Sequence, residues 1–260
     1  MKPYFESKYS KLYNGDCVEV MQKMIDQGIK IDKVITSPPY NIIKPNRGDR
    51  GYDLYSDGMT NEEYMDWTIN IFNLFDKLMN KNGCVLYNMS YGTENTECMP
   101  LTVASIINNT NFTMADILVW KKRGAMPNSM SSNKMTRTTE LIYVFCRKEE
   151  FKTFTCNKKV SSIRENGIIN YENIFNFFEA DNNDETQDLN KATFSTQFVQ
   201  NLIDRYVLKE DVVLDMFSGT GTTIYCCEQN EIKSYGIELS EKQCEHTKKR
   251  FLKGVQTMLL

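Results

Sequence analysis

Two adjacent prolines, Pro38 and Pro39, follow a short apolar run near the start of the chain. Proline lacks an amide hydrogen and has a fixed φ, so a proline pair cannot lie inside a helix or a central strand. The apolar run therefore predicts a strand that ends in a stiff loop. That loop presents three groups suited to holding a ligand: the hydroxyl of Ser37, the backbone carbonyl of Pro38 and the aromatic ring of Tyr40.

A second strand-ending turn lies far along the chain. The apolar run 212–217 leads into the turn Gly219-Thr220-Gly221, and Glu238 ends the strand expected next. Glycines let a backbone approach a ligand closely, and an acidic residue at that position can hold ribose hydroxyls. The turn completes neither the dinucleotide fingerprint nor a phosphate-binding P-loop. Because Asp215 would repel a pyrophosphate, the turn favours a cofactor that carries a cation, such as the sulfonium and amino groups of S-adenosylmethionine.

Strands and helices alternate along most of the chain, which predicts a doubly wound, mostly parallel α/β sheet. Two strands joined by a polar loop, 113–120 and 140–146, predict an antiparallel hairpin at a sheet edge. Residues 151–190 show no sustained period and are expected to form an irregular insert with little core. The other expected strands are 11–14, 32–36, 84–89, 212–217 and 234–238, and the expected helices are 17–24, 60–78, 99–108, 198–206, one ending near 230 and one ending near 253.

The chain of 260 residues is long enough for one large domain or a domain with an insert. It has no apolar run near the ~20 residues of a membrane span and no signal-peptide core. Its eight cysteines lack C-x-x-C spacing and there is one histidine, which argues against a zinc site. Scattered thiols suit a reducing compartment, so we expect a cytoplasmic location away from membranes.

Charge is unevenly distributed, although the formal net charge is only −3. Eleven basic and three acidic residues lie between Lys121 and Arg164, followed by seven acidic and no basic residues between Glu165 and Asp188. Neighbouring blocks of opposite sign predict one face that binds an anionic polymer and another that is kept away from it.

Taken together, the two turns resemble the amino-group DNA methyltransferases, which methylate the exocyclic nitrogen of cytosine or adenine. Ser37-Pro38-Pro39-Tyr40 matches the family's catalytic (D/N/S)-P-P-(Y/F) motif, and Phe217, Gly219 and Gly221 match its F-x-G-x-G cofactor motif. The catalytic motif comes first, which is the β-group order. The resemblance covers nearly the whole chain and implies a Rossmann-like methyltransferase fold with S-adenosylmethionine as the methyl donor. Between the motifs, the run 190–195 keeps only the Ala and Phe of the family's H-P-A-x-F-P.

The resemblance also implies residue roles. The oxygens of Ser37 and Pro38 would accept the hydrogens of the target amine on a flipped-out base that stacks on Tyr40. Asp16 would contact the cofactor's adenine, Glu238 its ribose and Asp215 its methionine end. The candidate catalytic residues are Ser37, Pro38, Pro39 and Tyr40. The candidate cofactor-binding residues are Asp16, Ser37, Phe194, Asp215, Phe217, Ser218, Gly219, Thr220, Gly221, Thr222 and Glu238. The candidate DNA-binding residues are Asn41, Lys44, Arg47, Arg50, Lys121, Lys122, Arg123, Lys134, Arg137, Lys158 and Lys159, and no metal ligand is expected.

The residues exclude one methylation reaction and leave several others open. Methylation of cytosine carbon-5 is not expected, because it needs a thiolate usually placed directly after a proline, and no cysteine here follows one. Ser37 before the proline pair favours cytosine N4, with adenine N6 as the alternative. Two more distant alternatives are methylation of a protein glutamine and a DNA-binding module without activity.

The resemblance divides the chain into three parts. Residues 1–150 form the catalytic part, with the catalytic loop at 36–41, residues 151–190 form a candidate target-recognition insert, and residues 191–260 form the cofactor-binding part. Double-stranded DNA is the expected partner. The insert is short for a recognition region, so either the Lys121–Arg137 loop shares in recognition or a second subunit reads part of the site. The small recognition region mildly favours a homodimer, and the resemblance leaves room for a cognate restriction endonuclease.

Overall fold

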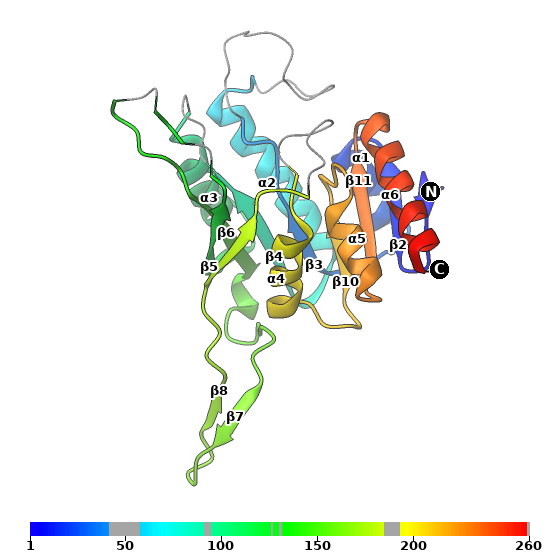
Figure 1. Cartoon of the computed structure of the whole chain (residues 1–260). Coiled ribbons are helices and arrows are strands. Elements are labelled where there is room, and N and C mark those ends of the chain that lie inside the picture. Colours follow the sequence, from blue (N-terminus) through cyan, green and yellow to red (C-terminus); the bar gives the residue numbers. More distant parts are fainter. Residues whose placement is uncertain (42–57, 91–94, 126, 130–131, 185–192, 259–260) are drawn as a thin grey trace.

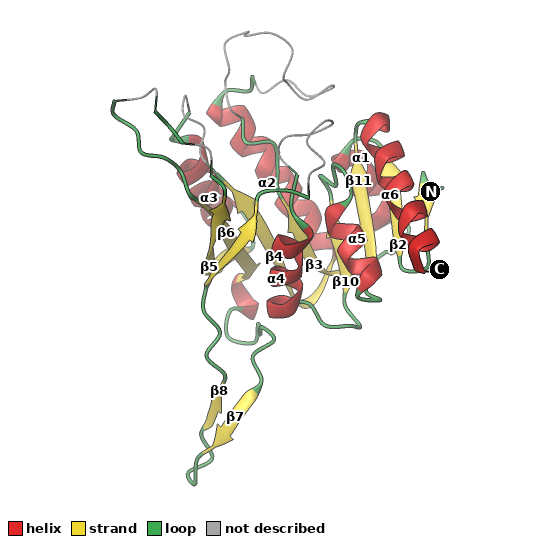
Figure 2. Ribbon diagram, in the orientation of Figure 1, coloured by secondary structure: helices red, strands yellow, loops and turns green. Residues whose placement is uncertain are grey.

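The computed structural model describes residues 1–41, 58–90, 95–125, 127–129, 132–184 and 193–258. They form a nine-stranded mixed sheet with helices on both faces and a separate two-stranded sheet (Figure 1; Figure 2). The strands are β1 (Phe5–Glu6), β2 (Ser10–Asn14), β3 (Ile31–Thr36), β4 (Met79–Met89), β5 (Phe112–Arg123), β6 (Thr139–Arg147), β7 (Val160–Ile163), β8 (Ile169–Tyr171), β9 (Phe177–Asp181), β10 (Val212–Asp215) and β11 (Lys233–Glu238). The helices are α1 (Cys17–Asp26), α2 (Asn61–Leu78), α3 (Cys98–Asn109), α4 (Thr196–Tyr206), α5 (Thr222–Gln229) and α6 (Glu241–Met258), with a 3₁₀ turn at Lys148–Glu150.

The large sheet has the order β1-β2-β11-β10-β3-β4-β6-β5-β9. Its five neighbouring strands β2, β11, β10, β3 and β4 run parallel, as expected from the alternation of strands and helices. β6 runs antiparallel to both β4 and β5. The sequence-based fold class, a doubly wound and mostly parallel α/β sheet, is confirmed.

Helix starts follow the local sequence. Asp16 caps α1, because its Oδ1 accepts hydrogen bonds from the amides of Val18 and Glu19. Thr60 caps α2 in a capping box with Glu63, which fixes the start expected from the sequence.

The two faces of the sheet have separate cores. Helices α1, α2 and α3 cover one face, where Phe72 of α2 packs edge-on against Tyr87, Phe112 and Phe145. Helices α4 and α5 cover the other face, and α6 packs there beside α5 and β2. This double layer holds the carboxyl ends of the central strands in place.

The expectation of an irregular segment from 151 to 190 is wrong, because three strands, β7, β8 and β9, lie within it. Residues 177–181 form β9, which pairs in parallel with β5 and is the edge strand of the sheet. Phe178 and Ala180 are buried, while Phe177, Glu179 and Asp181 are exposed. This alternation over five residues is a strand signal that the acid-rich composition concealed. The β5–β6 hairpin therefore lies inside the sheet rather than at its edge.

The strands β7 and β8 form an arm that extends away from the body of the protein (Figure 1). The arm leaves from the amino-terminal edge of the parallel strands, since Asn157 at its base donates to the carbonyl of Val207, just before β10. The loop after β3 lies at the opposite edge of the sheet. Several large apolar side chains of the arm are exposed, including Ile163 and Ile169. In the described part of the chain, no helix combines the length and apolar character needed to cross a membrane.

Candidate active site

The two sequence motifs come together at the carboxyl edge of the parallel strands. β3 pairs directly with β10, and Val34 lies beside Leu214 in the register. The loop that follows β3 and the glycine-rich turn that follows β10 are therefore neighbours. A crevice at the carboxyl ends of parallel strands is the common binding position in open α/β sheets.

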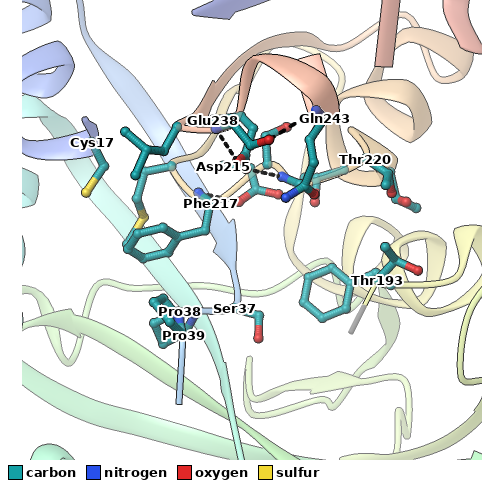
Figure 3. Close-up of a pocket in the computed structure, with 18 of the residues that line it drawn as sticks. Cys17, Ser37, Pro38, Pro39, Thr193, Asp215, Phe217, Thr220, Glu238 and Gln243 are labelled. Carbon is teal, nitrogen blue, oxygen red and sulfur yellow. Dashed lines mark hydrogen bonds between the residues drawn. The ribbon is translucent and has the colours of Figure 1, made fainter. Parts of the chain in front are cut away.

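A cavity of about 360 Å³ lies between the loop and the turn. This volume is within the range of small-molecule sites. Figure 3 shows Ser37, Pro38 and Pro39 on one side of the cavity and Asp215 and Glu238 on another. Nearly all the candidate cofactor-binding residues line it, namely Asp16, Ser37, Phe194, Asp215, Phe217, Ser218, Gly219, Thr220, Thr222 and Glu238.

Asp215 is a buried carboxylate, with 2 % of its surface exposed. Burial raises the pKa of Asp215 to about 6. Its hydrogen bonds favour the charged form and oppose this rise. Its Oδ1 accepts from Thr36 Oγ1 at 2.8 Å and from the Phe217 amide at 3.2 Å. A buried acid at the wall of a cavity is suited to a cationic ligand.

Glu238 lies at the end of β11 and is held by backbone amides. Its Oε2 accepts from the Gly219 amide and its Oε1 from the Ser240 amide, each at 2.8 Å. Burial raises the pKa of Glu238, and these two hydrogen bonds oppose the rise. The carboxylate thereby joins the glycine-rich turn to the start of α6 and lines the cavity.

The glycine-rich turn is shaped by its own packing. Gly221 has φ of 76°, and a Cβ there would come within 2.3 Å of Thr247 Cγ2. Gly221 is a candidate cofactor-binding residue, but the structure places it beside the cavity lining, where it starts α5. The buried hydroxyls of Ser218 and Thr220 have no hydrogen-bond partner among the described residues. Unpaired buried hydroxyls at a cavity fit a polar ligand, because leaving them unpaired is costly.

The loop Ser37–Tyr40 is held by several side chains. Tyr64 of α2 donates from its hydroxyl to the Pro39 carbonyl at 2.7 Å. Ser37 Oγ lies 3.0 Å from the hydroxyl of Tyr40. The ring of Tyr40 is partly buried against the first core. Tyr40 also donates from its hydroxyl to Asn88 Oδ1 of β4 at 2.8 Å, so the loop is fixed from both the helix side and the sheet side.

The cavity has further lining residues that sequence reasoning missed. Trp67 of α2 packs on Phe217, with ring centroids 5.6 Å apart. Thr193 and Gln243 enter from the segment before α4 and from α6 (Figure 3). Cys17 also lines the cavity, but burial raises the pKa of its thiol to about 12, so it is a thiol rather than a thiolate at neutral pH. No group of three or more metal-ligating side chains exists among the described residues.

Comparison with known proteins identifies the family. A family model described as DNA methylase, of the N6/N4 type, matches residues 31–249. The chain belongs to this DNA methylase family. The curated relative Type II methyltransferase M.BglII of Bacillus subtilis is 25% identical over 257 residues, which cover 90% of this chain and 66% of that protein, so the chain spans about two thirds of the relative's length.

Two solved structures share the fold. The PvuII DNA methyltransferase, named as cytosine-N4-specific, has a TM-score of 0.72 and 16% identity over 96% of this chain and 89% of its own. The M1.HpyAVI–SAM complex has a TM-score of 0.64 and 21% identity over 93% of this chain and 99% of its own. Both likenesses concern the fold.

The candidate DNA-binding residues of the methylase lie in different places. Asn41 is fully buried, and its side chain donates to the Met59 carbonyl, which differs from the expected DNA contact. Lys44, Arg47 and Arg50 lie outside the described residues. Lys134 and Arg137 precede β6 at the catalytic edge, whereas Lys158 and Lys159 lie at the base of the arm at the opposite edge.

The expected separation of basic and acidic faces is wrong where β5 meets its neighbours. Lys121 pairs with Glu179 at 2.7 Å, and Arg123 lies 3.9 Å from Asp181. Both acids belong to β9, which the parallel register places beside the end of β5. Lys122 forms an ion pair with Glu140 of β6 instead. The two charge blocks of the sequence therefore partly neutralise each other across adjacent strands.

Proposed function

We propose that this methylase transfers a methyl group from S-adenosylmethionine to the N4 amine of cytosine in double-stranded DNA. The observation that carries the proposal is that Ser37 and Pro38 line one cavity together with the acids Asp215 and Glu238.

The cavity residues fit the cofactor. Asp215 would hold the cationic methionine end, Glu238 the ribose and Asp16 the adenine. The buried hydroxyls of Ser218 and Thr220 form no hydrogen bond with the other described residues and are available to the cofactor. When bound, the cofactor supplies a methyl group on a sulfonium, which is a strong electrophile.

The catalytic loop supplies acceptors for the target amine. The lone pair of an exocyclic amine is delocalised into the ring, which makes it a poor nucleophile. Acceptance of its hydrogens by Ser37 Oγ and the Pro38 carbonyl favours a pyramidal nitrogen with a localised lone pair. A base must leave the duplex to reach this position, at a cost of a few kcal/mol. Stacking on Tyr40 would recover roughly 1–3 kcal/mol of that cost.

The choice of cytosine rests on Ser37. A serine before the proline pair is the pattern usually seen in cytosine-N4 enzymes, and an acidic or amide residue is usual for adenine N6. The cytosine-N4 specificity named for the PvuII structure supports the same choice. Both bases present an amine beside a ring nitrogen, so adenine N6 is the alternative outcome of the test.

The assembly and cellular setting are part of the same proposal. Exposed apolar side chains on the arm, among them Ile163 and Ile169, support self-association into a homodimer. A cognate restriction endonuclease is the proposed partner in the cell, and the cytoplasm the proposed location.

Sequencing that detects modified bases would test the activity. DNA from a host without its own methyltransferases should acquire N4-methylcytosine in one sequence context when the wild-type protein is expressed. The Ser37→Ala variant should reduce this modification strongly and still bind S-adenosylmethionine in calorimetry. Cofactor binding without any DNA modification would favour a protein substrate, and no cofactor binding would favour a DNA-binding module without activity.

A further inference from the structure

The hydroxyl of Tyr40 is the centre of a hydrogen-bond network behind the catalytic serine. Ser37 Oγ lies 3.0 Å from Tyr40 Oη, Asn88 Oδ1 lies 2.8 Å from it and Glu140 Oε2 lies 3.2 Å from it. The side chains come from the catalytic loop, from β4 and from the first residues of β6. The network thus extends from the cavity into the antiparallel part of the sheet.

The chemistry of these partners fixes the direction of each hydrogen bond. Asn88 donates from Nδ2 to the Leu141 carbonyl at 3.1 Å, which turns its Oδ1 toward Tyr40. A carboxylate and an amide oxygen only accept, so the single phenolic proton of Tyr40 goes to Asn88 or Glu140. Ser37 must then donate to Tyr40. Its oxygen lone pairs remain available for hydrogens of the target amine.

Glu140 is enclosed by protein and paired with a lysine. Its side chain is 10% exposed, and that of Lys122 is 24% exposed. The two form an ion pair across the β5–β6 ladder, and the Lys122 ammonium also lies 5.1 Å from the ring centroid of Trp120. Partly buried charges of opposite sign offset each other's desolvation. Lys122 therefore holds a carboxylate in place beside the Tyr40 hydroxyl.

We propose that Glu140 receives, through Tyr40 and Ser37, the proton that the target amine loses during methylation. This inference rests on the proposed amine methylation. As the nitrogen–carbon bond forms and the sulfur–carbon bond breaks, the sulfonium becomes a neutral thioether and the nitrogen acquires a positive charge. One amine proton passes to Ser37 Oγ, the serine proton to Tyr40 Oη and the tyrosine proton to the Glu140 carboxylate. Glu140 becomes neutral, and the proton then leaves through its exposed surface to water.

Glu140 and Lys122 act at a distance from the base, through Tyr40. A proton acceptor must be a carboxylate at position 140. A purely structural ion pair could instead be replaced by two neutral side chains, and this distinguishes the two roles. The role of Lys122 is then to hold the Glu140 carboxylate. This role takes the place of the DNA contact that the sequence of the protein predicts for Lys122.

The test uses the full chain in single-turnover and steady-state methylation assays. Glu140→Gln should lower kcat by roughly 10²–10⁴-fold, the usual size of general acid–base effects. The KM for DNA and the Kd for S-adenosylmethionine should change less than about twofold. Glu179→Gln is the matched control, because it also removes a carboxylate paired with a lysine of β5, and it should leave kcat unchanged.

Two double variants separate the proton path from a structural role. Tyr40→Phe interrupts the path, so the double variant with Glu140→Gln should be no slower than Tyr40→Phe alone, since residues acting as one unit are not additive. Lys122→Met combined with Glu140→Gln removes both charges and should stay slow. Recovery of kcat in that variant, or additive losses with Tyr40→Phe, would overturn the proposal.

The outcomes also separate this inference from the proposed function. If the wild-type protein methylates DNA and Glu140→Gln has the wild-type kcat, the proton path alone is wrong. If the wild-type protein binds the cofactor and methylates no DNA, the proposed function is wrong and the proton path is rejected with it.

Discussion

Thr36 Oγ1 donates a 2.8 Å hydrogen bond to Asp215 Oδ1, and both residues are buried. The bond joins the last residue of β3, which carries the catalytic loop, to the last residue of β10, which precedes the glycine-rich turn. The two strand ends that carry the motifs are thus connected side chain to side chain, and Asp215 lines the cavity. A substitution at the end of β3 should therefore change cofactor binding at the end of β10.

Thr36→Val should weaken cofactor binding without removing a residue of either motif. Valine has the shape of threonine and cannot donate, so the buried Asp215 carboxylate loses a partner. The loss should cost roughly 1–3 kcal/mol in the state with Asp215 ionised. The pKa of Asp215 should rise further above its usual range. Isothermal titration with S-adenosylmethionine at neutral pH measures the effect, and an unchanged Kd would mean that the Thr36 bond does not support the acid.

Cofactor affinity should depend on the ionisation of Asp215. Its pKa is raised to about 6 by burial, so the carboxylate is ionised at neutral pH and becomes protonated as the pH falls through about 6. A cationic ligand should therefore bind with a constant affinity above that pH and progressively more weakly below it. Asp215→Asn should bind weakly at all pH values and show no such dependence. An equally steep pH dependence in Asp215→Asn would assign the titration to another group.

The same raised pKa has a consequence for stability. The folded state binds a proton at Asp215 more tightly than the unfolded state, in which the carboxyl has its ordinary pKa of 3.8. The contribution of Asp215 to the free energy of unfolding should therefore rise as the pH falls from about 7 toward 4. At neutral pH, Asp215→Asn should stabilise the fold by about 1–3 kcal/mol. Chemical unfolding at the two pH values measures this, and destabilisation by the variant at neutral pH would contradict it.

Gly221→Ala should destabilise the protein through both strain and crowding. The residue has φ of 76°, and its new Cβ would lie 2.3 Å from Thr247 Cγ2. A loss of about 1–3 kcal/mol is expected from the strained backbone alone. Thr247→Ala in the same chain should recover part of the loss and leave the backbone strain. Full recovery in thermal unfolding would show that crowding by Thr247 is the whole effect.

The salt dependence of DNA binding should distinguish the two edges of the sheet. Lys134 and Arg137 lie at the catalytic edge, so their replacement by Ala should lower the salt slope by about 0.9 for each lost phosphate contact. Lys158 and Lys159 lie at the opposite edge, and their replacement by Ala is the matched control. We expect no change of slope in that control. A lower slope there would mean that the DNA also reaches the arm.

Much of the site could be predicted from local sequence rules. A proline pair ends a strand because proline cannot continue the hydrogen-bond ladder. A glycine-rich segment between an apolar run and a helix is in the same way typical of a strand–turn–helix unit. Asp16 and Thr60 cap helices for reasons that concern only their near neighbours. These features depend on residues within one turn or one strand end, which is why the sequence reveals them.

The missed features depend on strand order and register. β9 is short, and nothing local indicates that it pairs with β5. The ion pairs of Lys121 and Lys122 follow from which strands lie on either side of β5, and a charge count along the chain cannot supply that. The contact of Trp67 with Phe217 joins α2 to the cofactor turn across more than half of the sequence. Such contacts are visible only in three dimensions.

Nucleoside mass spectrometry can identify the base that the protein methylates. The purified protein is incubated with duplex DNA and S-adenosylmethionine labelled with deuterium in the methyl group, and the DNA is digested to nucleosides. We predict labelled N4-methylcytosine, which the Ser37→Ala variant produces at a strongly reduced level. Labelled N6-methyladenine would mean that adenine, not cytosine, is the target base. Labelled 5-methylcytosine, or no labelled base, would contradict the methylation of an exocyclic amine at this loop.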